Sequence, residues 1–322
     1  MSLFLPPNLV EPFTGALMAG IDVDGGPTAE QLGVLKAIVT HVWNRPDLEL
    51  MTIRRIGPTE LADVLLDEDH RNAFHELHLT LETCRHPMTD GQVQLVHDYA
   101  DALGVEGDDL LIFRDLVTEG VDAAAADYRR FLDHNLDERV EPSLVNVMPD
   151  ADLREAALAE KLEAFAEYGP GTLGRAFLSF YERFGLTLPG LDSSTHHHFF
   201  VAHDMTHTIA GLSTAVPAEI ALSAFQFAMN NDRLNRAALL ASLVAHEAGF
   251  AHPAHLAKAD DSVLAHPENA KLLSAELRRG SLCRGDFSLI DHFELAPMQI
   301  ADVRAEFGVQ APENPADGQH WW

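Results

Sequence analysis

The sequence predicts an all-α protein. Apolar residues recur at about 3.6-residue spacing along most of the chain, the alternation typical of β-strands is scarce, and two Thr-x-x-Gln patterns precede amphipathic segments. The chain has 322 residues, of which 47% are hydrophobic, enough for two domains with a core each. We therefore expect helical domains at residues 1–140 and 141–322, with a linker around Glu138–Asp152, where prolines interrupt the periodicity.

Capping and periodicity predict the helices of the first half. Thr28 and Gln31 have the spacing of a capping box, in which the Thr hydroxyl accepts from an early helical N–H and the Gln side chain reaches back. Thr89 and Gln92 repeat that spacing before a second apolar stripe. Further helices are expected at Pro58–Leu66, Arg71–Glu82, Leu110–Glu119 and Ala123–Asn135.

The second half continues in helices. Periodicity predicts Leu153–Tyr168, and Thr172 follows a Gly-Pro-Gly turn to open a helix over Arg175–Phe184. Gly211 is expected to end a later helix, and Pro217 suits the first turn of the one after it. These two helices would form a hairpin with converging polar residues.

That hairpin carries the pattern richest in chemistry. His203, Asp204 and His207 fall within an arc of about 100° on a helix, and Glu219 would point back from the start of the next helix. Two imidazole nitrogens and one or two carboxylates suit Zn²⁺, and would also accept Fe²⁺, Mn²⁺ or Co²⁺. A lone His-x-x-x-His also occurs on ordinary hydrated helix faces, but the two carboxylates favour metal binding.

Composition excludes several classes of partner. Lys and Arg number 22 against 50 Asp and Glu, and the formal charge of −28 opposes nucleic acids and anionic lipids. The 2 cysteines, Cys84 and Cys283, cannot build a disulfide framework or a Cys-rich zinc site. No apolar stretch reaches the roughly 18 residues of a spanning helix, and Met1–Glu11 lacks the basic residues of a signal or transit peptide. We expect a cytoplasmic, self-associating protein, with peripheral membrane contact left open.

Part of the first half resembles the TerB-like helical family. The resemblance rests on Ala19–Gln31 and its echo at Met88–Leu103, each an Asp-Gly turn before a capped helix, and it covers roughly Gly15–Gly120. It implies metal-ion binding and protein contacts, so we expect protein partners through the acidic N-terminal domain. Asp22 and Asp24 either solvate a turn or contribute to a Ca²⁺ site, although the further ligands of an EF-hand loop are lacking.

The second half resembles the Coq4 family of ubiquinone-biosynthesis proteins in three segments, in the same order. His203-Asp204-x-x-His207, eleven residues and Glu219 are similar to its metal motif. The flanking matches are Gly171–Phe177 with Phe180, then Arg279-Gly280 with Val303–Val309, and together the three cover about Leu162–Val309.

The resemblance implies an all-helical fold, a Zn²⁺-type site at those four residues and a hydrophobic cavity for a polyprenyl chain. Members of the family are implicated in removing the C1 carboxylate of a polyprenyl-hydroxybenzoate and in organising a biosynthetic complex. A metal-dependent decarboxylase would use the cation as a Lewis acid, with Asp204 and Glu219 as catalytic carboxylates.

Two other functions stay open. One is a lipid-binding scaffold with a structural metal, and the other is an HD-type phosphohydrolase, which would need a further His upstream and an Asp downstream. The spacing of His207 and Glu219 favours the Coq4-like site over the hydrolase. Secondary candidates are the anion-binding pair Arg278 and Arg279, the histidines 196–198 as extra ligands or proton shuttles, and His246 beside the site.

Overall fold

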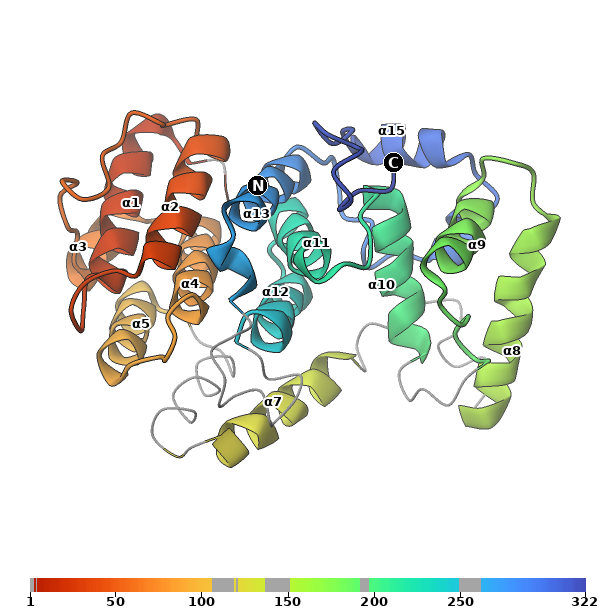
Figure 1. Ribbon diagram of the computed structural model, residues 1–322, viewed down its shortest axis with the longest axis horizontal. Coiled ribbons are helices and arrows are strands. Elements are labelled where there is room, and N and C mark those ends of the chain that lie inside the picture. The colour runs from red at the N-terminus through yellow and green to blue at the C-terminus, as the bar shows by residue number, and fades with distance from the viewer. Residues whose placement is uncertain are drawn as a thin grey trace. The chain divides into compact units, whose positions relative to one another are not determined.

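A computed structural model describes residues 3, 5–105, 119, 121–136, 151–191, 197–248 and 262–322. These residues form helices and connecting loops, and within the described ranges β-pairing is confined to two isolated antiparallel bridges, Thr172–Gln299 and Leu212–His320 (Figure 1). The all-α prediction is confirmed.

The α-helices of the first 136 residues are α1 (Pro7–Ile21), α2 (Ala29–His41), α3 (Pro58–Val64), α4 (Glu68–Thr83), α5 (Asp90–Leu103) and α7 (Val121–Leu136). Those that follow are α8 (Ala151–Glu163), α9 (Leu173–Phe184), α10 (His197–Ala210), α11 (Val216–Met229), α12 (Arg233–His246), α13 (Pro267–Ser281), α14 (His292–Leu295) and α15 (Ile300–Phe307), with 3₁₀ turns η2 (Ala164–Glu167) and η3 (Val263–Ala265). The predicted helix Leu110–Glu119 lies outside the described residues except for Glu119.

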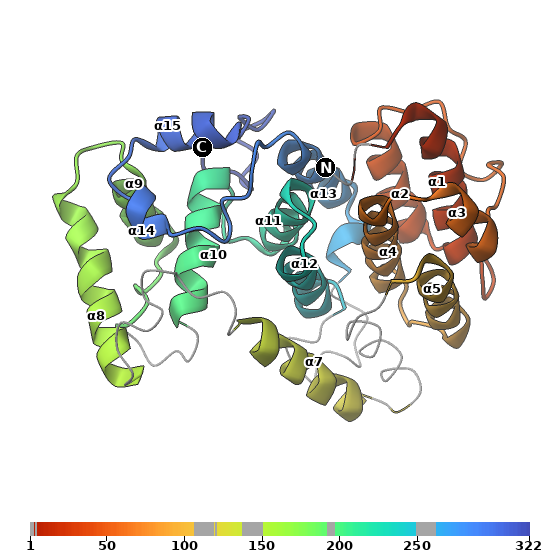
Figure 2. The same ribbon diagram turned by 180° about the vertical axis from the view of Figure 1, so that it is seen from behind.

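The chain forms two compact units, and neither is a continuous segment. One comprises Met1–Leu132 and Ser223–Ser281, and the other Asp133–Leu222 and Leu282–Trp322. This division differs from the two consecutive domains expected from the sequence, because α13 packs beside α2, and α12 beside α4, as both ribbon views show (Figures 1 and 2). The predicted boundary at residue 140 lies outside the described residues.

Contacts between residues that are distant in the sequence hold α12 in the first unit. Val244 of α12 is fully buried in an apolar cluster with Leu79 and Val96. The Tyr128 hydroxyl donates to the Ala241 carbonyl oxygen over 2.9 Å. None of these pairings follows a local sequence pattern, so the periodicity of the separate helices could not reveal them.

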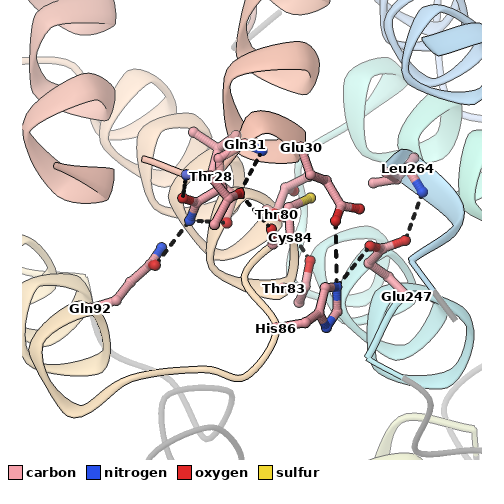
Figure 3. A network of polar contacts seen from close by, with 11 residues as sticks. Thr28, Glu30, Gln31, Thr80, Thr83, Cys84, His86, Gln92, Glu247 and Leu264 are labelled. Atoms are coloured by element: carbon pink, nitrogen blue, oxygen red, sulfur yellow. Dashed lines mark hydrogen bonds and ion pairs between the residues drawn. The ribbon is translucent and has the colours of Figure 1, made fainter. Parts of the chain in front are cut away.

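The first predicted capping box is confirmed and the second is wrong. Thr28 accepts from the Gln31 N–H, and Gln31 Oε1 accepts from the Thr28 N–H at 2.9 Å. Thr89 occupies the N-cap of α5 but makes no side-chain cap hydrogen bond. The reason is that Gln92 Oε1 instead accepts from Gln31 Nε2 at 2.9 Å (Figure 3). It also accepts from Arg85 Nε at 2.6 Å.

Arginines hold the Asp-Gly loop before α2. Arg55 pairs with the Asp22 carboxylate at 3.0 Å, and the Arg85 guanidinium donates to the carbonyl oxygens of Val23 and Gly26. Asp24 adopts a left-handed backbone with φ 48°. These contacts favour the interpretation of this segment as a structural turn.

In the second unit, the two segments that flank the metal motif in the sequence pair with each other. Gly171, at φ 80°, accepts from the Ile300 N–H at 2.9 Å, and the Leu173 N–H donates to Met298. Thr172 caps α9 by accepting from the Arg175 N–H. α15 thereby lies against the start of α9. Among the described helices, none is both long enough and apolar enough to cross a bilayer.

Candidate metal centre

The centre is built on the turn between α10 and α11. α10 ends as predicted, because Gly211 adopts φ 74° and its N–H donates to His207 O at 2.8 Å. α11 begins at Val216, which places Pro217 and Glu219 in its first turn. A carboxylate at this position interacts favourably with the positive end of the helix dipole.

The structure brings the predicted donors together. The Nε2 atoms of His203 and His207 are 3.1 Å apart, and each lies 3.2 Å from Glu219 Oε2. An Asp204 carboxyl oxygen lies within 4.8 Å of a ring nitrogen of each histidine. The two histidines thus face Glu219 of the following helix, and they also lie within reach of Asp204 on their own helix.

The His207 ring is held in one tautomer. Its Nδ1 lies 3.3 Å from the Leu212 carbonyl oxygen. A carbonyl oxygen only accepts, so Nδ1 carries a hydrogen, and Nε2 faces the cluster, where it donates to Glu219 when the ring is charged and offers a lone pair once that proton is lost. Histidine ligands of metals are typically held in this way by a partner of the second ring nitrogen.

Asp204 is oriented by Tyr181 of α9. The Tyr181 hydroxyl donates to Asp204 Oδ2, and Asp204 is 7% exposed. Burial, the largest influence, raises the pKa of Asp204 against the opposing charges of His203 and His207. No local pattern singled out Tyr181, although it lies in the helix that carries the first Coq4-like match.

The contact between His207 and Glu219 shifts their pKa values in opposite directions. Burial alone would raise the pKa of Glu219, but the charge of His207 and hydrogen bonds from both histidines hold that pKa well below its usual range. Burial alone would lower the pKa of His207, but Glu219 raises it. Glu219 is therefore an anionic oxygen donor rather than a neutral carboxyl group.

The spacing of the donors fits a transition metal. Ligands about 2.05 Å from a cation are separated by about 3.3 Å in a tetrahedron and about 2.9 Å along the edge of an octahedron. The observed separations of 3.1 and 3.2 Å among His203, His207 and Glu219 lie between these values. The His207 side chain is 0% exposed, whereas His203 and Glu219 are 18% and 20% exposed, so one side of the cluster is accessible.

Aromatic side chains and the end of the chain enclose the rest of the cluster. Phe180 of α9 stacks on the His207 ring at a centroid distance of 5.6 Å and lies at the same distance from Trp321. Arg304 of α15 donates to the carbonyl oxygens of Thr208 and Ile209, which are otherwise the open end of α10. The sequence carried no signal for the contacts of Trp321 and Arg304, since each depends on tertiary packing.

Several secondary candidates have other roles or lie elsewhere. The prediction that Arg279 recognises anions is wrong, because this side chain is 6% exposed, pairs with Glu276 and lies over the Phe225 ring. Arg278 donates to the His41 carbonyl oxygen at 3.2 Å. His246 belongs to the other compact unit. Residues outside the description, in whole or in their side chains, include His196, His197, His198, His252 and His255.

The apolar run Ala221–Met229 was open to interpretation as core or as a lipid cavity. Phe225 and Phe227 are both 0% exposed, and the Phe225 backbone packs directly against Gly280 of α13. For these two residues the arrangement is that of a packed core. The polyprenyl cavity remains a prediction.

Comparisons with known proteins assign no family. No protein-family model matches the chain, and no curated protein sequence matches it. A solved structure from Nostoc punctiforme, of a protein provisionally assigned to ubiquinone biosynthesis, aligns with 75% of this chain and 98% of its own. The two are 19% identical, with a TM-score of 0.33, too low to establish a shared fold or function. The TerB-like and Coq4-like resemblances remain predictions from motifs.

Proposed function

We propose that this chain binds a Zn²⁺-type cation through His203, Asp204, His207 and Glu219 and acts on a lipophilic precursor of a polyprenyl quinone. The observation that carries the proposal is the convergence of both Nε2 atoms and Glu219 Oε2 at separations of 3.1–3.2 Å. Fe²⁺, Mn²⁺ and Co²⁺ are alternative occupants, because they accept the same donors.

The reaction that best suits this arrangement is C1 decarboxylation of a polyprenyl-hydroxybenzoate. The bound cation would supply Lewis acidity toward the carboxylate or phenolate oxygens of the substrate. Loss of CO₂ leaves an electron pair on the ring carbon, and that carbon must then receive a proton. The hydrogen-bonded pair of Tyr181 and Asp204 holds a proton beside the cluster in a site largely closed to water.

The remaining residues orient and shield the site. Leu212 O fixes the tautomer of His207, and Phe180 covers one face of its ring. Phe184 lies edge-on to Trp321, and both of these rings are partly exposed. An aromatic surface beside an anionic and cationic cluster suits a ligand that combines a phenolic head with an apolar chain.

A non-catalytic isoprenoid-binding scaffold with a structural metal is the second candidate. Structural zinc sites are closed, whereas catalytic sites keep an accessible position. The partial exposure of His203 and Glu219 therefore favours catalysis over a structural role.

Replacing His207 separates the two functions. The His207→Ala variant should lose the metal bound at this centre and turnover of a polyprenyl-hydroxybenzoate while its near-ultraviolet circular dichroism is retained. His292→Ala is the matched control, because His292 is also 0% exposed and bonds a backbone carbonyl oxygen, that of Phe287, at 2.8 Å. The control should lower thermal stability without lowering metal content. A His207→Ala variant that binds as much metal per chain as the unmodified protein would contradict the proposal, and loss of metal and stability in a chain that shows no turnover in either form would favour the scaffold.

A further inference from the structure

A second group of donor side chains lies in the other compact unit. Glu30 stands in the first turn of α2, His86 follows the end of α4, and Glu247 is the C-cap of α12. His86 Nε2 lies 3.3 Å from Glu247 Oε1 and 3.7 Å from Glu30 Oε2 (Figure 3). One donor atom from each of the three residues lies within 4.8 Å of the other two.

The three side chains are largely buried, and one of them is held by a backbone hydrogen bond from another segment. Glu247 is 1% exposed, and its second oxygen accepts from the Leu264 N–H at 2.9 Å. The side chains of Glu30 and His86 are 11% and 17% exposed. The close view shows both carboxylates turned toward the imidazole ring from different segments (Figure 3).

One oxygen of the group lacks a partner. Among the described residues, Glu30 Oε1 is closed to solvent and accepts no hydrogen bond. A buried carboxyl oxygen without a partner is unfavourable, because it loses its hydration without replacement. An atom that receives lone pairs from all three residues, as a cation does, would satisfy it.

The charges indicate what that atom is. Burial first, then the hydrogen bond and negative charge of Glu247, raise the pKa of Glu30 to about 8. The carboxyl oxygens of Glu30 and Glu247 lie within 4.8 Å of each other, and two carboxylates this close ionise together only when a positive charge compensates them. A divalent cation supplies that charge and is also a partner for the unpaired oxygen.

We propose that Glu30, His86 and Glu247 form a second binding site for a divalent transition-metal cation. One imidazole with two carboxylates suits Mn²⁺, Fe²⁺ and Zn²⁺, and is less suited to Ca²⁺, which prefers oxygen donors alone. The neighbouring Cys84 Sγ is directed elsewhere, since it donates to Thr80 O at 3.1 Å. The inference does not depend on the function proposed for the other unit.

The cation would join segments that are distant in the sequence. Glu30 and His86 are 56 residues apart, and Glu247 follows His86 by 161 residues. A cation held by all three links α2, the segment after α4 and the end of α12. Its expected effect is stabilisation of this unit, since a ligand that binds only the folded state raises thermal stability.

The test counts metal ions in the full chain after the first centre has been removed. A His203→Ala/His207→Ala variant, stripped with a chelator, should bind one Mn²⁺ per chain by electron paramagnetic resonance of free Mn²⁺ and by elemental analysis. Adding Glu30→Gln should abolish that binding and the accompanying rise in melting temperature. This variant should fold, because a neutral amide resembles the protonated carboxyl group that Glu30 carries without metal.

His70→Ala is the matched control, since His70 lies 3.9 Å from the single carboxylate of Asp67 in the same unit. It should keep the full Mn²⁺ stoichiometry. No binding by the double variant, or binding that survives both Glu30→Gln and Glu247→Gln, would overturn the inference. If the double variant instead keeps as much metal as the unmodified chain, and Glu30→Gln removes it, the first centre fails while the second stands.

Discussion

Replacing the buried Glu82 carboxyl should stabilise the protein at neutral pH. Glu82 lies on α4 and is 1% exposed, and neither of its oxygens has a hydrogen-bond partner among the described residues. Burial raises its pKa from 4.5 to about 8. The folded protein must therefore bind a proton here that the unfolded chain releases at neutral pH.

The magnitude and sign follow from linkage. Because the pKa of Glu82 is raised in the folded state, its contribution to the free energy of unfolding is fully present below pH 4.5. That contribution is lost as the pH rises to about 8. At pH 7 this lowers the free energy of unfolding by about 3 kcal/mol, because each pKa unit corresponds to about 1.4 kcal/mol. Glu82→Gln removes the ionisation while keeping the shape, so the variant should be more stable than the natural chain by about 2–3 kcal/mol near pH 7.

The assay is urea unfolding of the variant and the natural chain at a series of pH values. The stability difference should be near zero at about pH 4.5 and should grow steadily toward pH 8. Glu49→Gln, an exposed carboxylate in the same unit, is the control and should change stability by less than about 0.5 kcal/mol. A difference that does not vary with pH would refute the reasoning, because the mechanism acts only through proton binding.

Three further substitutions test the candidate metal centre and the packing of α9 and α10 around it. Tyr181→Phe should weaken metal binding by about tenfold with the fold retained, because it leaves Asp204 without its orienting hydroxyl; calorimetric titration with Zn²⁺ would measure this. Arg304→Ala should lower stability by about 1–2 kcal/mol in thermal unfolding, since two carbonyl oxygens at the end of α10 lose their donor. An unchanged melting temperature would contradict that assignment. Gly174→Ala should destabilise by about 1–3 kcal/mol, because its Cβ would lie 2.9 Å from aromatic carbons, whereas Gly169→Ala, with open space around it, should be tolerated.

The amino-acid sequence was most informative where interactions are local. The capping box at Thr28, the end of α10 at Gly211 and the shared face of His203 and His207 all follow from spacing within a few residues. The position of Glu219 near the two histidines could be predicted because a short turn between consecutive helices allows few orientations of the second helix. The identical spacing at Thr89 gave a wrong capping box, since Gln92 is drawn into contacts with residues from other helices.

The sequence alone therefore determined the helical class and the proximity of His203, His207 and Glu219, because helix periodicity and turn residues act over one or two turns of chain. Tertiary structure alone decided that Tyr181 holds Asp204, that Arg279 is buried against Phe225, and that Glu30, His86 and Glu247 meet. These pairings form when distant helices exclude water between them, and the free energy of that packing is not encoded in any local pattern.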